Sequence, residues 1–309
     1  MGRRYLDLAR LGRNSPGRYL AALGLIFFFW FGLGFAVMAL MLSARGAVRA
    51  LGGPAAGRFL EYVALNLSFV TFLIGILLAV KWIHQRSPRT LITPASRVDW
   101  RRVAQGFVVW LVLAALASLV EALLFPGRYE LSLNLPLFLA MAPVVLLLTP
   151  LQTSSEELFF RGYLLQAFGL RTRNPLALAL ITAALFTLPH LGNPEIAAAG
   201  GPLIVASYFG IGVLLALVTL ADDGLELALG AHAANNLYSA LVANYTVSAL
   251  PTESIFVVKE IDAVYADLSL LAIAVVFWLL VFRVLKRSVP ADTAERGSGS
   301  GSVTSPSDE

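Results

Sequence analysis

The chain has no cysteine among its 309 residues. It therefore has no disulfide framework, no thiolate metal ligand and no cysteine nucleophile. Charged residues are also scarce, at 14% of the chain against 58% for hydrophobic residues. This composition excludes an ordinary soluble globular protein. The net charge of +4 does not indicate a nucleic-acid partner, because the basic residues lie beside apolar blocks rather than in a separate basic domain.

The apolar residues form blocks close to the length of roughly 20 residues that a bilayer-spanning helix needs. We therefore expect an all-α polytopic membrane protein with about eight transmembrane helices, for which the lipid bilayer is the surrounding partner. The first block is longer than the apolar region of a cleaved signal peptide, so we expect it to be retained. The predicted spans are 19–43, 62–80, 103–124, 137–168, 175–191, 203–221, 225–243 and 263–285.

The distribution of Lys and Arg predicts the orientation of these spans. Both terminal segments, with the second and fourth connections, carry most of the basic residues. Since basic loops stay in the cytoplasm, both termini are predicted to be cytoplasmic. We divide the chain into a basic cytoplasmic N-terminus at 1–18, an eight-helix membrane domain at 19–285 and a disordered, Gly/Ser-rich cytoplasmic tail at 286–309.

Three of the predicted spans contain polar side chains, each with a partner residue four positions away in the same span. A charged side chain at mid-bilayer costs about 2.5–3.5 kcal/mol, so such residues are expected to serve a purpose. Residues four apart share a helix face. The pairs are Glu157 and Arg161, Phe186 and His190, and His232 and Asn236.

Glu157 and Arg161 can form an ion pair within their helix, which leaves Glu156, about 100° around that helix, free to face the bundle. At about 1.5 Å of rise per residue, Glu156, His190, His232 and Asn236 lie roughly 15–22 Å from the predicted cytoplasmic ends. The common depth predicts one intramembrane site. We expect Phe186 to have a packing role beside it.

These groups favour peptide-bond hydrolysis, which needs a nucleophile, a base and a stabiliser for the oxyanion. No histidine begins an HExxH zinc-protease motif, and Asp267 is the only aspartate inside a predicted span, so an aspartic dyad is excluded. There remains a water activated by Glu156 with help from His190, with His232 and Asn236 as donors to the oxyanion. This arrangement requires no cofactor.

A zinc site is the alternative to this metal-free arrangement. Glu156, His190 and His232 form the carboxylate and imidazole ligand set of a catalytic zinc ion with an open fourth position. The sequence leaves both arrangements open.

The motifs resemble those of the CAAX protease and bacteriocin-processing family of intramembrane proteases, which includes the type II CAAX prenyl endopeptidases. The resemblance covers residues 152–241, which we take as the protease core. The motifs that carry it are Glu156-Glu157-x-x-x-Arg161, Phe186-x-x-x-His190 and His232-x-x-x-Asn236, in this order.

The resemblance implies that Glu156 is the catalytic glutamate and that His190 is its partner in activating water. It implies that His232 and Asn236 form the oxyanion site, and that Glu157 and Arg161 are essential supports. Members have been described both as metalloproteases and as glutamate-dependent proteases, so the resemblance leaves the metal question open.

The expected substrate is a membrane-associated or lipidated peptide or a membrane protein. Eukaryotic members cleave prenylated proteins, but the Ala-rich, Arg-over-Lys composition indicates a multi-pass protein of a bacterial inner or plasma membrane. Bacterial relatives are linked to bacteriocin maturation and immunity, so a membrane protein that binds a partner without cutting it is the alternative function. A transporter is disfavoured, because the sequence shows no internal repeat.

Overall fold

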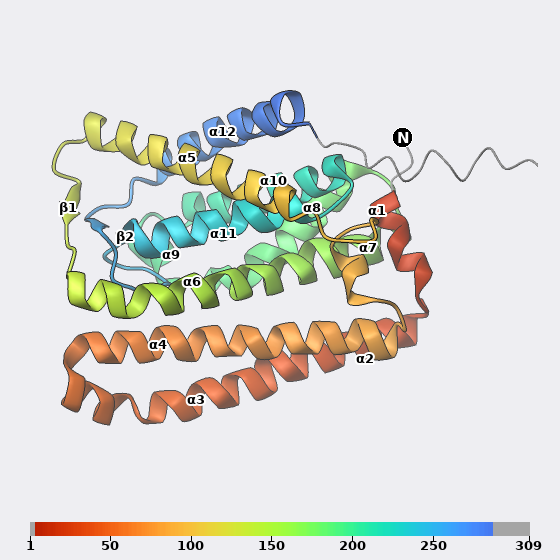
Figure 1. Cartoon of the computed structure of the whole chain (residues 1–309), viewed down its shortest axis with the longest axis horizontal. Helices are drawn as coiled ribbons and strands as arrows, with labels where there is room; N and C mark the ends of the chain where they lie inside the picture. Colours follow the sequence, from red (N-terminus) through yellow and green to blue (C-terminus); the bar gives the residue numbers. More distant parts are fainter. Residues whose placement is uncertain (1–3, 287–309) are drawn as a thin grey trace, which may run out of the picture.

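The structure is a computed structural model that describes residues 4–286. The predicted tail beyond residue 286 lies outside the described residues, as do residues 1–3. The described chain is almost entirely helical, with three short strands at one end of a helical bundle (Figure 1). The predicted all-α polytopic architecture is confirmed.

Seven helical segments of residues 4–286 are long and apolar enough to cross a membrane. Several of them run from an α-helix into a wider π turn or a tighter 3-10 turn. Their parts are α2 (Pro16–Phe27), η2 (Phe28–Gly34) and α3 (Phe35–Ser43); α4 (Arg45–Leu78) and η3 (Ala79–Ile83); α5 (Trp100–Leu124); α6 (Leu135–Glu157), η5 (Leu158–Leu164) and α7 (Leu165–Phe168); α8 (Pro175–Thr187) and η6 (Leu188–Gly192); α10 (Pro202–Asp222); and α12 (Ala263–Leu279) and η7 (Leu280–Val284).

The remaining predicted span, 225–243, corresponds to α11 (Glu226–Leu241), which has 16 residues and is shorter than the other seven. This helix contacts α5, α6 and α10 and lies inside the bundle (Figure 1). Because protein rather than lipid surrounds it, α11 can carry polar residues that an exposed span could not.

The second span begins earlier than the predicted residue 62. Helix starts at Arg45, and the chain bends sharply at Gly53, where φ is +75°. Only glycine adopts this left-handed backbone without strain, and the following Pro54 lacks an N–H to continue the helical ladder. The sequence Gly52-Gly53-Pro54 therefore marks a kink inside one helical segment rather than a loop before it.

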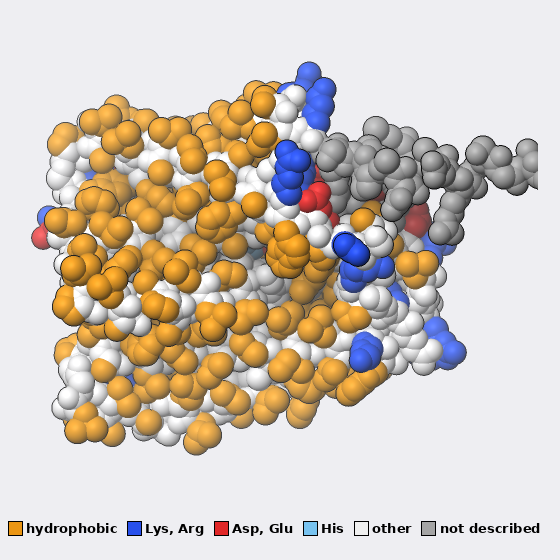
Figure 2. Space-filling model, viewed as in Figure 1, with side chains coloured by type: hydrophobic (Ala, Val, Ile, Leu, Met, Phe, Trp, Pro, Cys, Tyr) orange, Lys and Arg blue, Asp and Glu red, His pale blue; other side chains and the backbone are white. Residues whose placement is uncertain are grey.

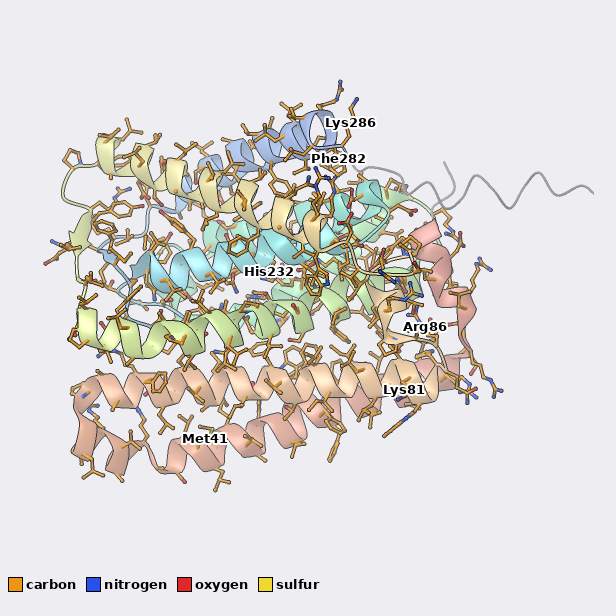
Figure 3. All side chains as sticks on the ribbon, in the orientation of Figure 1. Met41, Lys81, Arg86, His232, Phe282 and Lys286 are labelled. Carbon is orange, nitrogen blue, oxygen red and sulfur yellow. The ribbon has the colours of Figure 1, made fainter. Side chains whose placement is uncertain are left out.

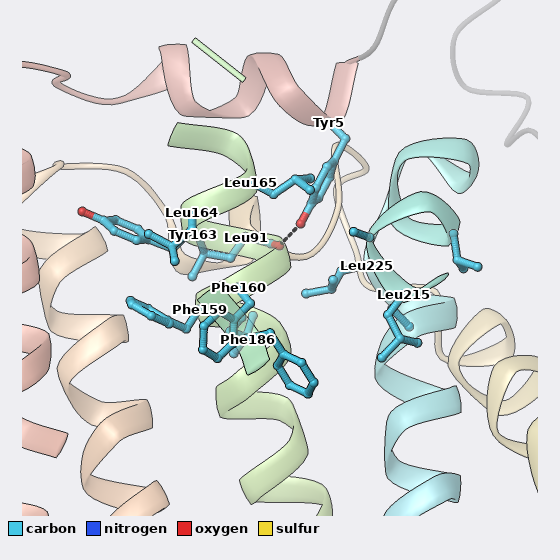
Figure 4. Packing of buried hydrophobic residues seen from close by; sticks show 14 of the residues in the cluster. Tyr5, Leu91, Phe159, Phe160, Tyr163, Leu164, Leu165, Phe186, Leu215 and Leu225 are labelled. Atoms are coloured by element: carbon cyan, nitrogen blue, oxygen red, sulfur yellow. Dashed lines mark hydrogen bonds between the residues drawn. The ribbon is translucent and has the colours of Figure 1, made fainter. Parts of the chain in front are cut away.

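The N-terminal segment, predicted only as a basic extension, folds onto the bundle. It forms α1 (Arg4–Asp7) and η1 (Leu8–Leu11), and buries Tyr5 and Leu6. The Tyr5 hydroxyl hydrogen-bonds the backbone oxygens of Leu91, at 2.5 Å, and Arg161, at 3.1 Å (Figure 4). A residue near the start of the chain thus touches the backbone of the predicted site.

Three strands tie together two connections at the end of the bundle opposite α1, which we call the sheet end. They are β1 (Tyr129–Leu131), β2 (Ala243–Tyr245) and β3 (Phe256–Val258), in the order β1-β3-β2. Strand β1 is antiparallel to β3, with Tyr129 opposite Val258, and β2 is parallel to β3. The α5–α6 connection is thereby held against the segment that joins α11 to α12.

The opposite end, which we call the basic end, carries α1 and the last described residues (Figure 1). Figure 2 shows hydrophobic side chains along the length of the visible helices and Lys and Arg gathered at the basic end. Lys81, Arg86 and Lys286 lie there in Figure 3. The basic-residue rule predicts that this end faces the cytoplasm.

A buried ion pair at the basic end involves Arg102, one of the basic residues of the second predicted connection, between spans 62–80 and 103–124. Arg102 and Asp222 are each 2% exposed in their side chains, with Nη2 and Oδ1 2.8 Å apart. Arg102 also donates through Nη2 to the carbonyl of Val281, so it joins α5 to α10 and η7. Arg102, which the sequence analysis used only to predict orientation, therefore connects three helical segments.

Glycines allow α5 and α11 to approach one another backbone to backbone. A Cβ added at Gly230 would lie 2.0 Å from the carbonyl oxygen of Val103, and one at Gly106 would lie 2.3 Å from that of Leu227. Neither position accepts a larger residue unless the helices separate. This contact fixes α11 in the bundle interior.

We expect Gly230→Ala to lower the free energy of unfolding by at least about 1–3 kcal/mol, because the added methyl group must push α5 away from α11. Gly24→Ala in α2 is the matched control, since a Cβ there meets no atom within 4 Å. Thermal unfolding of both variants in one detergent gives the comparison. Equal stability of the two variants would contradict the proposed close approach.

Candidate active site

The predicted ion pair between Glu157 and Arg161 forms inside the bundle. Arg161 Nη1 donates to Glu157 Oε1 at 2.7 Å, and both side chains are fully buried. Glu157 ends α6, and Arg161 lies in η5, where the helix widens into a π turn. Such turns are frequent at functional sites.

Arg161 is further held by two neighbouring helices. Its Nη2 donates to the carbonyl of Gly212 in α10 at 3.2 Å. Its guanidinium carbon lies 4.2 Å from the centre of the Phe186 ring of α8, a cation–π contact. The predicted packing role of Phe186 is thus observed, and the contact is to the buried cation.

His232 joins α11 to both glutamates. Its Nδ1 lies 2.8 Å from Glu157 Oε1, and its Nε2 lies 3.6 Å from Glu156 Oε2. An ionised carboxylate only accepts hydrogen bonds, so Nδ1 carries the proton in the first contact. His232 therefore presents Nε2 to the Glu156 side of the site.

Gln152 is a site residue to which the sequence analysis assigned no role. Its Nε2 donates to Glu156 Oε2 at 3.2 Å, and its Oε1 accepts from Asn236 Nδ2 at 3.2 Å. It links the catalytic candidate of α6 to the amide of α11. The sequence could have predicted this contact, because Gln152 lies four residues before Glu156 and therefore on the same helix face.

His190 lies where α8 tightens into the 3-10 turn η6 at Pro189. Its Nδ1 lies 2.7 Å from the carbonyl oxygen of Phe186, which can only accept. The proton is therefore on Nδ1, and Nε2 is left as an acceptor. The ring centre lies 4.4 Å from that of Phe186 and 4.6 Å from that of Tyr208.

A cavity of about 340 Å³ extends from these residues to the sheet end. Gln152, Phe186, His190, His232 and Asn236 line its inner part. Its outer part is lined by side chains of α5, α10, α12 and the three strands. Figure 3 shows His232 in the interior of the bundle, away from both ends. The structure thus brings His190 of η6 to the same cavity as His232 and Asn236 of α11.

Glu156 was expected to face the site directly, but it lies behind the wall of the cavity. It is 4% exposed and does not line the cavity, whereas its partners Gln152 and His232 do. Access from the cavity to its carboxylate therefore depends on these two side chains.

No group of three or more His, Cys, Asp or Glu side chains among residues 4–286 is arranged to hold a metal ion. Glu156 and His232 are neighbours, with His232 Nε2 3.6 Å from Glu156 Oε2, whereas the closest ring neighbours of His190 are Phe186, at 4.4 Å, and Tyr208, at 4.6 Å between ring centres. The predicted zinc ligands are not gathered into one set in this arrangement.

The third histidine, His84, lies at the basic end and outside this cavity. Its Nε2 is 2.9 Å from the Tyr163 hydroxyl, and its Nδ1 is 2.9 Å from the carbonyl oxygen of Arg13. Burial lowers the pKa of His84. It fastens the N-terminal segment to the bundle.

The residues of this site lie in a segment that is similar to a known family model. Residues 135–238 match the family model described as type II CAAX prenyl endopeptidase Rce1-like, and all seven predicted site residues fall in this range. The uncharacterized protein YyaK of Bacillus subtilis (strain 168) is 41% identical over 180 residues, or 57% of this chain. The aligned region spans 60% of the relative's length. No solved structure matches the chain.

We expect Arg161→Ala to lower the free energy of unfolding by about 3–5 kcal/mol, because it leaves Glu157 as a buried charge without its cation. Arg58→Ala is the control, since the Arg58–Glu253 pair is partly exposed and such pairs contribute about 0–1 kcal/mol. Thermal unfolding in detergent measures both. An Arg161 variant no less stable than the Arg58 variant would refute the structural role of the buried pair.

Proposed function

We propose that the chain is an intramembrane endopeptidase, because residues 135–238 match the family model described as type II CAAX prenyl endopeptidase Rce1-like. Its substrate would be a membrane-associated or lipidated peptide or a membrane protein, cut inside the bundle. The observation that carries this proposal is the polar network around Glu156, which joins a buried carboxylate to the imidazole and amide groups of a cavity.

In the proposed reaction, Glu156 removes a proton from a water molecule, with His190 Nε2 as the second acceptor. The water oxygen attacks the scissile carbonyl carbon, and the carbonyl oxygen becomes an oxyanion. Asn236 Nδ2 donates to that oxyanion, and His232 donates through Nε2 when that nitrogen carries a proton in addition to the one on Nδ1. The proton passes to the leaving nitrogen as the C–N bond breaks, which releases a carboxyl end and an amine end.

Gln152 controls access in this mechanism. Its side chain is hydrogen-bonded to both Glu156 and Asn236. Gln152 lines the cavity, whereas Glu156 lies behind it and does not. Substrate binding must displace it for water to reach the carboxylate. The Asn236 amide, no longer bonded to the displaced Gln152, is then available to the oxyanion.

The chain is proposed to act in a bacterial cell membrane without a metal cofactor. The similarity to the uncharacterized protein YyaK of Bacillus subtilis supports a bacterial setting. In the metal-free route Glu156 acts through its contacts with Gln152 and His232.

A binding function without cleavage is the second candidate. The deep position of Glu156, at 4% exposure and outside the lining of the cavity, favours it. In that case the same cavity holds a peptide and confers immunity or assists assembly, and Glu156 serves only to position His232 and Gln152.

We expect Glu156→Gln to lower cleavage by at least about 100-fold, because it removes the general base and keeps the shape of the side chain. The assay uses protein in nanodiscs and a panel of quenched prenylated peptides and leader peptides. Glu130→Gln is the matched control, since Glu130 is an exposed acid whose ion pair is with Lys259 at the surface.

A zinc chelator separates the two chemical routes in the same assay. Cleavage that survives chelation supports the metal-free route. Cleavage that is lost and then restored by zinc would make Glu156, His190 and His232 metal ligands. A Glu156→Gln protein that cleaves nothing but still complements deletion of the gene would support the binding function instead.

The cavity also predicts the side from which substrate enters. It extends from the site to the sheet end, which the basic-residue rule places outside the cytoplasm. We therefore propose that the cleaved segment enters from the extracytoplasmic side or from the outer half of the bilayer.

The absence of cysteine makes this orientation simple to test. We expect a membrane-impermeant maleimide to label Thr246→Cys, at the sheet end, in intact cells, and to label Ser87→Cys, at the basic end, only after permeabilisation. Both positions are exposed in the structure. The reverse labelling pattern would place the cavity on the cytoplasmic side.

A further inference from the structure

Glu195 is a buried carboxylate in the wall of the cavity that the mechanism above does not use. It lies in the short helix α9 (Pro194–Ala198), between the fifth and sixth spans, and is 8% exposed. Its Oε1 accepts a hydrogen bond from the backbone N–H of Ala249 at 2.6 Å. Its Oε2 is buried and has no hydrogen-bond partner among the described residues.

Glu195 differs from the other carboxylates of the cavity. Glu121 and Asp262 also line it, and both pair with Arg128, at 2.9 Å and 3.3 Å. Within residues 4–286, no Lys or Arg lines the cavity, and Glu195 forms no ion pair. The cavity is therefore left with one carboxylate whose charge the described chain does not neutralise.

An ionised carboxylate removed from water without a cation is destabilising. A group kept at such a cost is expected to gain its partner from a ligand. The matching ligand is a cation small enough to enter the cavity, such as the ammonium of lysine or the guanidinium of arginine. The tyrosine rings of the wall can pack against the apolar stem of such a side chain and face its charge.

A chain of contacts connects Glu195 to the catalytic histidine candidate. His190 stacks on Tyr208, with ring centres 4.6 Å apart. The Tyr208 hydroxyl accepts from Asn193 Nδ2 at 2.8 Å, and Asn193 lies two residues before Glu195. All four residues line the same cavity. A peptide whose scissile bond lies at His190 therefore passes close to Glu195.

We propose that Glu195 is a specificity-determining residue that binds a lysine or arginine side chain of the peptide near its scissile bond. The part of this inference that concerns a bond that is cut rests on the proposed protease function. The recognition of a cation in the cavity stands on the geometry alone, and it applies equally to a protein that binds a peptide without cutting it.

The alternative is that Glu195 only anchors the 248–250 loop through Ala249. Glu195→Gln separates the two, because the amide oxygen keeps the bond to the Ala249 N–H while the charge is removed. Glu130→Gln is the control, since it removes a negative charge at the same end of the molecule from an exposed residue outside the cavity.

The experiment measures binding of two fluorescein-labelled apolar peptides, one with a single lysine and one with norleucine in its place. The proteins are held in nanodiscs and carry Glu156→Gln, so that neither peptide is cut, and fluorescence anisotropy gives each Kd. We expect the lysine peptide to bind at least about tenfold more tightly, and Glu195→Gln to abolish that preference. The Glu130→Gln protein should retain it.

A second variant keeps the test decisive. Glu195→Lys should reverse the preference, so that a glutamate peptide binds more tightly than the lysine peptide. Two outcomes would overturn the proposal. One is equal binding of the lysine and norleucine peptides to the Glu156→Gln protein in which Glu195 is unchanged, and the other is a lysine preference that survives Glu195→Gln. Equal loss of both peptides in Glu195→Gln would also overturn it, and would leave the anchoring role.

The proposal and the protease function fail separately. A lysine preference that depends on Glu195, in a protein that cleaves no peptide, would refute the protease function and retain cation recognition. Cleavage that depends on Glu156, but not on the charge of the peptide or on Glu195, would support the protease function and refute cation recognition.

Discussion

The arrangement of the site depends on the hydrogen bonds to the buried Glu157 carboxylate. One oxygen, Oε1, accepts from both Arg161 and His232, which joins α6 and η5 to α11. Arg161 in turn holds the Gly212 carbonyl of α10 and the Phe186 ring of α8. Four spans that carry or support polar groups are thus oriented by one buried pair. In a membrane interior such a pair cannot be replaced by water, so its geometry constrains every helix that it touches.

The second constraint is the distance between α5 and α11. A helix as short and as polar as α11 would be a poor membrane span by itself, and it is stable here because Gly106 and Gly230 let α5 cover it closely. The same contact brings Asn235 to Trp110, whose indole N–H donates to the Asn235 side chain at 3.2 Å. Packing and polar satisfaction therefore act together to place His232 and Asn236 at the cavity.

The cavity gives the network its chemical setting. Its inner wall carries imidazole and amide groups, and its outer wall reaches the small sheet, where the Arg128 side chain neutralises Glu121 and Asp262. The family match to type II CAAX prenyl endopeptidases covers the inner wall, whereas the outer wall includes segments beyond residue 238. The similarity to that family therefore extends to the whole inner wall but to only part of the outer wall.

The sequence alone determined the helical spans, the Glu157–Arg161 pair and the three motifs, because hydropathy and four-residue spacing act within one helix. It did not place Gln152 between Glu156 and Asn236, or Glu195 in the wall of the cavity. It also treated Arg102 as a topological charge rather than the partner of Asp222. These relationships join residues that are distant in the chain or lie in connections without a periodic pattern. Only the packing of the helices could decide them, since which side chains meet depends on helix rotation and contact distance.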